Sequence, residues 1–244
     1  MSRRRTIGFD RRIELDWLDT TASRLAAGAT LAELRSQMWT YLDGKVSGDK
    51  FNSDRGKTMT VLTHIWGKVP PPAQALQARA LPAFSQAKNE ERLAVHWAMM
   101  MATYPVFSDV AAAAGRLLAL QSNFSLAQLT KRMVALWSER PVLVKSTQRI
   151  IRSMVQWGAL EDTETKGMYR ALKTRCVLPV ETSLLLCQAA LLDGERPSFP
   201  CTQLLEHPAF FPFALSLSVD DFRKSSHFNV HREGHDTDVI ELAK

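Results

Sequence analysis

The stretch from Leu126 to Leu172 constrains the fold most, because helical periodicity and strong turn signals alternate along it. Apolar residues recur at helical spacing over residues 126–137, and Ser125 immediately before them is a favourable N-cap. Pro141 follows soon after, and proline cannot continue a helix. The pattern therefore predicts one helix, a tight break, and then a second helix.

The second helix is predicted to be amphipathic. Ser146 is expected to cap its start, and Gly158 is placed for the left-handed conformation that often ends a helix. The face expected to be buried carries Ile150, Ile151, Met154 and Val155. The opposite face carries Lys145, Gln148, Arg149, Arg152 and Gln156.

A turn-rich segment at residues 161–167 and an expected strand from Met168 to Leu172 come next. Two helices joined by a tight turn and followed by a hairpin define a winged helix-turn-helix. The second helix of that motif fits the major groove of DNA, and Arg and Gln are natural readers of base edges. The stretch therefore predicts duplex DNA binding. A winged helix that only holds another protein, with a solvated basic face, is the alternative.

The net charge of this region favours DNA binding over binding to another protein. Residues 131–175 contain ten basic and four acidic side chains, a net charge of +6 that equals the net charge of the whole chain. The residues expected to contact DNA from the second helix are Lys145, Ser146, Gln148, Arg149, Arg152 and Gln156. Those expected to contact phosphates from the wing are Lys166, Arg170 and Lys173.

A second unit of the helix-turn-helix kind is possible near the N-terminus. Thr30 and Glu33 form a capping box for a helix that runs to about Leu42, and another helix is expected at residues 55–66. Ordinary bundle helices are the alternative there. The opening arginine run either touches phosphates or a minor groove, or is a solvated tail. The candidate DNA contacts of this region are Arg55, Lys57, Arg3, Arg4 and Arg5.

The whole chain is predicted to be mainly α, a helical scaffold that carries a winged helix-turn-helix and short β-hairpins. Residues 1–69 would form an N-terminal helical unit, 70–122 a helical scaffold, and 123–244 a winged-helix region that ends in a β-hairpin. The three consecutive prolines Pro70–Pro72 are the strongest break in the helical pattern, and we expect extended backbone there. His96 is expected to be a hydrogen-bonded core residue.

No catalytic or metal-binding pattern is evident. Three cysteines with no close pair favour a reducing cytoplasm over disulfides or a zinc ribbon. His227, His231 and His235 fall on an expected strand and turn, where positions four apart lie about 13 Å from each other. Hydrolase, metalloprotease and nucleotide-loop motifs are missing, and no apolar run is long enough to span a bilayer. We therefore expect a cytoplasmic protein that is not an enzyme and takes no metal or cofactor.

Four segments together resemble a known family. They are Tyr104–Val110 (YPVFSDV), Asn123–Leu126 (NFSL), Ser146–Glu161 with its STQRII and WGALE ends, and Leu204–Pro208 (LLEHP) ahead of two phenylalanines. The chain resembles, in the order of these features, the small helical accessory "A" protein of BREX bacteriophage-exclusion systems. That family's glycine after the second phenylalanine is absent, and Pro212 stands there.

The resemblance implies a non-enzymatic, mostly helical DNA-binding protein with winged-helix features. It also implies partners in antiphage defence: duplex DNA, an adenine methyltransferase, an alkaline-phosphatase-like protein and an ATPase. Two other functions stay open from the sequence. One is a protein-interaction scaffold of such a complex without DNA contact, and the other is a winged-helix transcriptional regulator.

Overall fold

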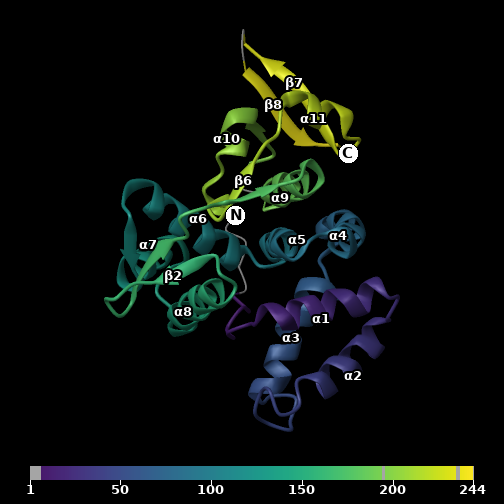
Figure 1. The fold of residues 1–244 in the computed structure, drawn as a ribbon, viewed down its shortest axis with the longest axis vertical. Coiled ribbons are helices and arrows are strands. Elements are labelled where there is room, and N and C mark those ends of the chain that lie inside the picture. The colour runs from purple at the N-terminus through teal and green to yellow at the C-terminus, as the bar shows by residue number, and fades with distance from the viewer. Residues whose placement is uncertain (1–6, 194–195, 235–236, 244) are drawn as a thin grey trace.

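A computed structural model describes residues 7–193, 196–234 and 237–243 (Figure 1). The described residues contain eleven α-helices and eight short strands, so the mainly helical fold class is confirmed. Figure 1 places α1–α3 at one end of the molecule and the hairpin of β7 and β8 at the other, with α7, α8 and β2 to one side.

The N-terminal helices are α1 (Leu15–Ala26), α2 (Leu31–Tyr41) and α3 (Asp54–Trp66). Thr30 and Glu33 form the predicted capping box at the start of α2, with the Glu33 amide donating to the Thr30 hydroxyl. Most of the surface of α3 is buried, including Thr58 and Thr63. A helix that is covered on so many sides is a core helix rather than an exposed reader of DNA.

The middle of the chain forms the 3-10 helix η1 (Pro71–Ala73) and the helices α4 (Gln74–Gln86), α5 (Asn89–Thr103) and α6 (Pro105–Leu120). Pro70 is extended as predicted, but Pro71 and Pro72 lie within η1. The expectation of extended backbone through all three prolines is therefore wrong, because proline fits the first positions of a helix, where no N–H is needed. The three prolines are therefore the start of the next helical segment rather than a wholly extended linker.

His96 on α5 is a core residue, as predicted. Its side chain is fully buried, its Nδ1 accepts from Trp66 Nε1 at 3.1 Å, and its Nε2 donates to the Asp19 carboxylate at 2.8 Å. Burial lowers the pKa of His96, since the charged form would lose its hydration. The imidazole therefore joins α1, α3 and α5 in its neutral form.

The central stretch forms β1 (Asn123–Ser125), α7 (Leu126–Trp137), α8 (Pro141–Gln156), β2 (Leu160–Asp162) and β3 (Met168–Ala171). The three strands make an antiparallel sheet in the order β1-β3-β2. Phe124 pairs with Tyr169 across β1 and β3, and Glu161 pairs with Arg170 across β2 and β3. The sequence indicated β3 but not β1 or the full extent of β2.

The C-terminal part contains β4 (Cys176–Leu178), α9 (Val180–Leu192), β5 (Ser198–Pro200), α10 (Cys201–Leu205), η2 (Pro208–Phe210), β6 (Phe213–Leu215), α11 (Val219–Lys224), β7 (Phe228–Glu233) and β8 (Thr237–Leu242). The predicted terminal hairpin is confirmed as β7 and β8, and β5 adds a third strand on the β8 side. Strands β4 and β6 form a separate parallel pair.

One hydrophobic core runs through the molecule, from Ile7 to Ile240. Trp97 of α5 lies at its centre, with its ring edge-on to Phe107, Trp157 and Phe213 at 5.0, 6.3 and 5.5 Å between centroids. The core therefore crosses both boundaries of the three predicted regions. The division into those regions stays a prediction.

Candidate nucleic-acid interface

Helix α8 begins earlier than the sequence indicated. Its first residue is Pro141 and its N-cap is Arg140, so Ser146 does not cap it, and that prediction is wrong. Proline is favoured at the first helical position, where its fixed φ suits the helix. Helix α7 ends at Trp137, before the proline, and Pro141 starts α8.

Ser146 is also unavailable as a DNA contact. It lies within α8 with its side chain fully buried, and its hydroxyl finds no hydrogen-bond partner among the described residues. Thr147 beside it is buried with an unpartnered hydroxyl as well. The predicted contact of Ser146 with DNA is therefore not supported, because α8 begins before this residue and its side chain faces the core.

The two faces of α8 are otherwise those that the periodicity predicts. Ile150, Ile151 and Met154 are fully buried. Lys145, Gln148 and Arg149 are exposed on the opposite face, and their side chains make no hydrogen bond or ion pair with any other described residue. The middle of α8 therefore presents a polar face whose donors are free.

The C-terminal end of α8 holds the N-terminal segment. The Ile13 amide donates to Ser153 Oγ at 2.9 Å, and Trp157 Nε1 donates to the Ile13 carbonyl at 2.9 Å. The Leu15 amide, at the start of α1, donates to Gln156 Oε1 at 2.9 Å. Gln156 is therefore engaged in docking α1, whereas the predicted role was contact with DNA.

Two of the expected DNA-contacting arginines are ion-paired with the strands of the hairpin. Arg152 Nη1 lies 2.7 and 2.8 Å from the two carboxylate oxygens of Asp162, and this hydrogen bond raises the pKa of Arg152. Arg170 Nε lies 2.8 Å from Glu161 Oε2. All four side chains are at least 40% exposed, so these pairs contribute little to stability.

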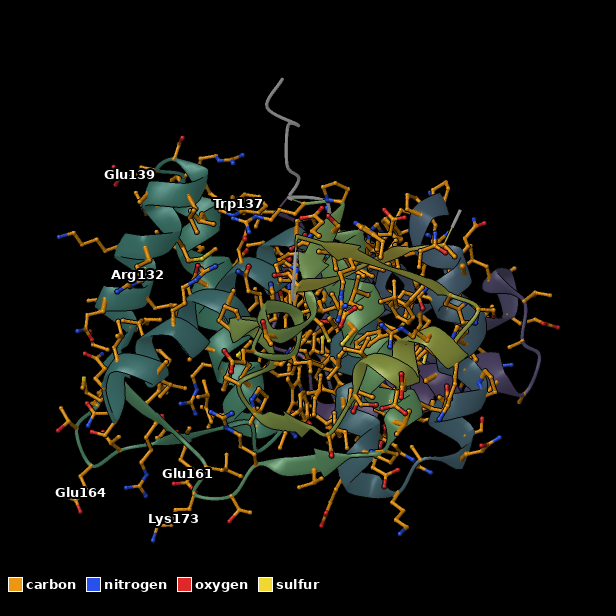
Figure 2. The ribbon with its side chains drawn as sticks, turned by 90° about the horizontal axis from the view of Figure 1, so that it is seen from above. Arg132, Trp137, Glu139, Glu161, Glu164 and Lys173 are labelled. Atoms are coloured by element: carbon orange, nitrogen blue, oxygen red, sulfur yellow. The ribbon has the colours of Figure 1, made fainter. Side chains whose placement is uncertain are left out.

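The remaining lysines of the hairpin are exposed. Lys166 lies in the turn between β2 and β3, and Lys173 follows β3. Figure 2 shows Glu164 and Lys173 along one edge of this unit, with Glu139 of the α7–α8 turn at the other edge. Lys131 of α7 and Lys166 line a common hollow of about 730 Å³, a proximity that the sequence did not indicate.

Arg55 is not available to DNA, and its prediction as a contact is wrong. Its side chain is buried, with Nε donating to the Trp39 carbonyl at 2.8 Å and Nη1 lying 2.7 Å from Asp43 Oδ1. The guanidinium also stacks over the Trp39 ring at 4.3 Å. Lys57 is exposed, as expected, and Arg3, Arg4 and Arg5 lie outside the described residues.

Among the described residues, neither His227 nor His231 belongs to a group of metal-ligating side chains. His231 Nε2 lies 3.5 Å from Glu233 Oε1, and His235 is outside the described residues. Within the part of the chain that the structure describes, no group of His, Cys, Asp or Glu side chains is arranged to hold a metal ion. None of the helices in that same part combines the length and hydrophobicity needed to cross a membrane.

No protein-family model, no curated protein and no solved structure matches the chain.

Proposed function

We propose that this protein is a cytoplasmic, non-enzymatic protein that binds duplex DNA. In this proposal α6, β1, α7, α8, β2 and β3 act as a winged helix-turn-helix, and α8 enters the major groove. The observation that carries the proposal is the free polar face of α8, formed by Lys145, Gln148 and Arg149, directly opposite its buried face.

The chemistry of that face suits base edges and phosphates. Lys145 and Arg149 are four apart on one helix, so their side chains are neighbours. Arg and Gln can each make bidentate hydrogen bonds to bases in the major groove, which is wide enough to admit a helix. Asp162 of β2 is paired with Arg152 of α8, so the hairpin lies beside α8, and Lys166 and Lys173 would reach phosphates from it.

Basic side chains outnumber acidic ones more strongly once the two ion pairs of this region are set aside. Two of the four carboxylates at residues 131–175 are engaged by Arg152 and Arg170, which leaves eight basic side chains and two acidic ones outside these pairs. A polyanion would meet few repulsive groups there. Phosphate neutralisation of this kind supplies most of the affinity in many protein–DNA complexes.

The resemblance to the BREX accessory protein supports a place for this activity in a phage-defence assembly with other subunits. A scaffold function in the same assembly would need a protein contact instead. Leu120 of α6 and Leu136 of α7 are 78% and 56% exposed and would be its first candidates. A transcriptional regulator that reads paired half-sites would need a dimer interface in addition.

The test is the double variant Lys145→Ala with Arg149→Ala. Duplex affinity is expected to fall at least 10-fold, because two cations that contact the duplex are lost, each contributing up to about 1–3 kcal/mol if it reads a base and somewhat less if it binds a phosphate. The melting temperature should stay near that of the parent, because both side chains are exposed. Fluorescence anisotropy with a labelled duplex at fixed salt measures the affinity.

The matched control is Lys224→Ala with Arg232→Ala, which removes the same charges from exposed positions near the terminal hairpin. Its affinity should stay close to that of the parent. Equal losses in the two double variants would indicate attraction by net charge alone. A parent-like affinity in the α8 variant would show that α8 does not bind DNA.

A further inference from the structure

Arg152 differs from the other cations on the polar face of α8, because it is held in place. Its Nη1 donates to both carboxylate oxygens of Asp162, at 2.7 and 2.8 Å, whereas Lys145 and Arg149 make no such contact within the described residues. The two partners are 40% and 48% exposed, so the guanidinium is fixed but still reachable by a ligand.

The position of Arg152 places it among the proposed DNA contacts. It lies three residues after Arg149 and four after Gln148, so the three side chains share the face opposite Ile150 and Met154. Asp162 comes from the end of β2 and pairs with Tyr169 of β3 in the sheet. The position of the carboxylate is therefore set by the sheet, and the carboxylate in turn sets the position of the guanidinium.

The donors of Arg152 that Asp162 does not engage have a distinct chemistry. Asp162 engages Nη1, and the Tyr169 side chain also interacts with the guanidinium, but neither Nε nor Nη2 makes a hydrogen bond as short and well aligned as those to Asp162. Two parallel N–H groups on one edge match the N7 and O6 acceptors of guanine in the major groove. A side chain already held in one orientation loses less freedom when it binds.

We propose that Asp162 positions Arg152 to read a guanine in the major groove. This inference rests on the proposed function, and it goes further by naming the base, the reading side chain and the residue that positions it. Arg149, Lys145 and the wing lysines would then supply affinity, and Arg152 would supply sequence preference. Asp162 is a positioning residue, since it acts through Arg152.

The hairpin contains a matched control for this pair. Arg170 and Glu161 form an ion pair at 2.8 Å with similar exposure, but both residues lie on the hairpin strands rather than on α8. Asp162→Asn and Glu161→Gln thus remove the same kind of contact from the same strand. A purely structural role for the Arg152–Asp162 pair would make the two variants behave alike.

The experiment selects preferred duplexes from a randomised pool with the full chain and with Arg152→Ala, Arg152→Lys, Asp162→Asn and Glu161→Gln. The parent should select a motif with a guanine at one position. Arg152→Ala should lose that preference by about 5- to 150-fold in relative affinity, while preferences elsewhere in the motif persist. Arg152→Lys should not restore the preference, because an ammonium cannot make the bidentate contact.

Asp162→Asn should weaken the guanine preference several-fold, whereas Glu161→Gln should leave it unchanged. Retention of the guanine in the Arg152→Ala motif, or equal behaviour of Asp162→Asn and Glu161→Gln, would overturn the inference and leave the proposed function standing. A parent that binds duplexes with no base preference would also overturn the inference and leave the proposed function standing. A parent that binds no duplex even at low salt would overturn both.

Discussion

Replacing Ile151 with aspartate is expected to destabilise the protein by about 4 kcal/mol or more, a large part of the total stability of an ordinary domain. Ile151 is fully buried on α8. Truncation of a buried isoleucine alone costs about 2–5 kcal/mol, and an unpaired carboxylate would lose its hydration in addition. Urea unfolding followed by circular dichroism measures the loss, and DNA binding should disappear with the fold.

The control for Ile151→Asp is Val144→Asp on the same helix. Val144 is 41% exposed, so a carboxylate at this position keeps contact with water. The control should lose less than about 1 kcal/mol, as is usual for a substitution at the surface. Similar losses in both variants would mean that the two faces of α8 are not assigned correctly.

Gly115→Ala is expected to destabilise the protein by about 2–3 kcal/mol, although alanine is the better helix former by about 1 kcal/mol. A Cβ at Gly115 of α6 would lie 1.9 Å from the Pro208 carbonyl oxygen and 3.2 Å from Phe211 Cβ. The carbonyl belongs to the backbone of η2, so it cannot rotate away as a side chain would. The packing of α6 against η2 must therefore open.

Thermal unfolding of the Gly115→Ala and Arg116→Ala variants separates the effect of this clash on stability from the effect of helix propensity. Arg116 is the exposed neighbour on α6, and its variant should stay within about 0.5 kcal/mol of the parent. A more stable Gly115→Ala protein would mean that propensity outweighs the clash, and that α6 and η2 do not approach as closely as described.

Features that depend on a few neighbouring residues were predictable from the sequence. The capping box at Thr30 and the N-cap at Ser125 are both present, because each depends only on a hydroxyl at the cap and on residues within one helical turn of it. The left-handed conformation of Gly158 follows from its place after a helical pattern. The two faces of α8 follow from its periodicity in the same way.

Features that depend on distant residues were not predictable. Strand β1 has three residues and exists because Asn123–Ser125 pairs with β3, far along the chain. Arg55 lies near a helix start and the sequence predicts it to be exposed, yet Trp39 of α2 and Asp43 in the turn after α2 enclose it. In the candidate site, the sequence indicated Arg152 and Arg170 but could not indicate that Asp162 and Glu161 pair with them, since those contacts depend on how the hairpin lies beside α8.

The measurement that tests the central claim most directly is the salt dependence of duplex binding by the full chain. If α8 and the hairpin neutralise about 4–6 phosphates, the logarithm of the association constant should fall against the logarithm of salt concentration with a slope of about −4 to −5. A slope near zero, or the absence of duplex binding at low salt, would contradict the account.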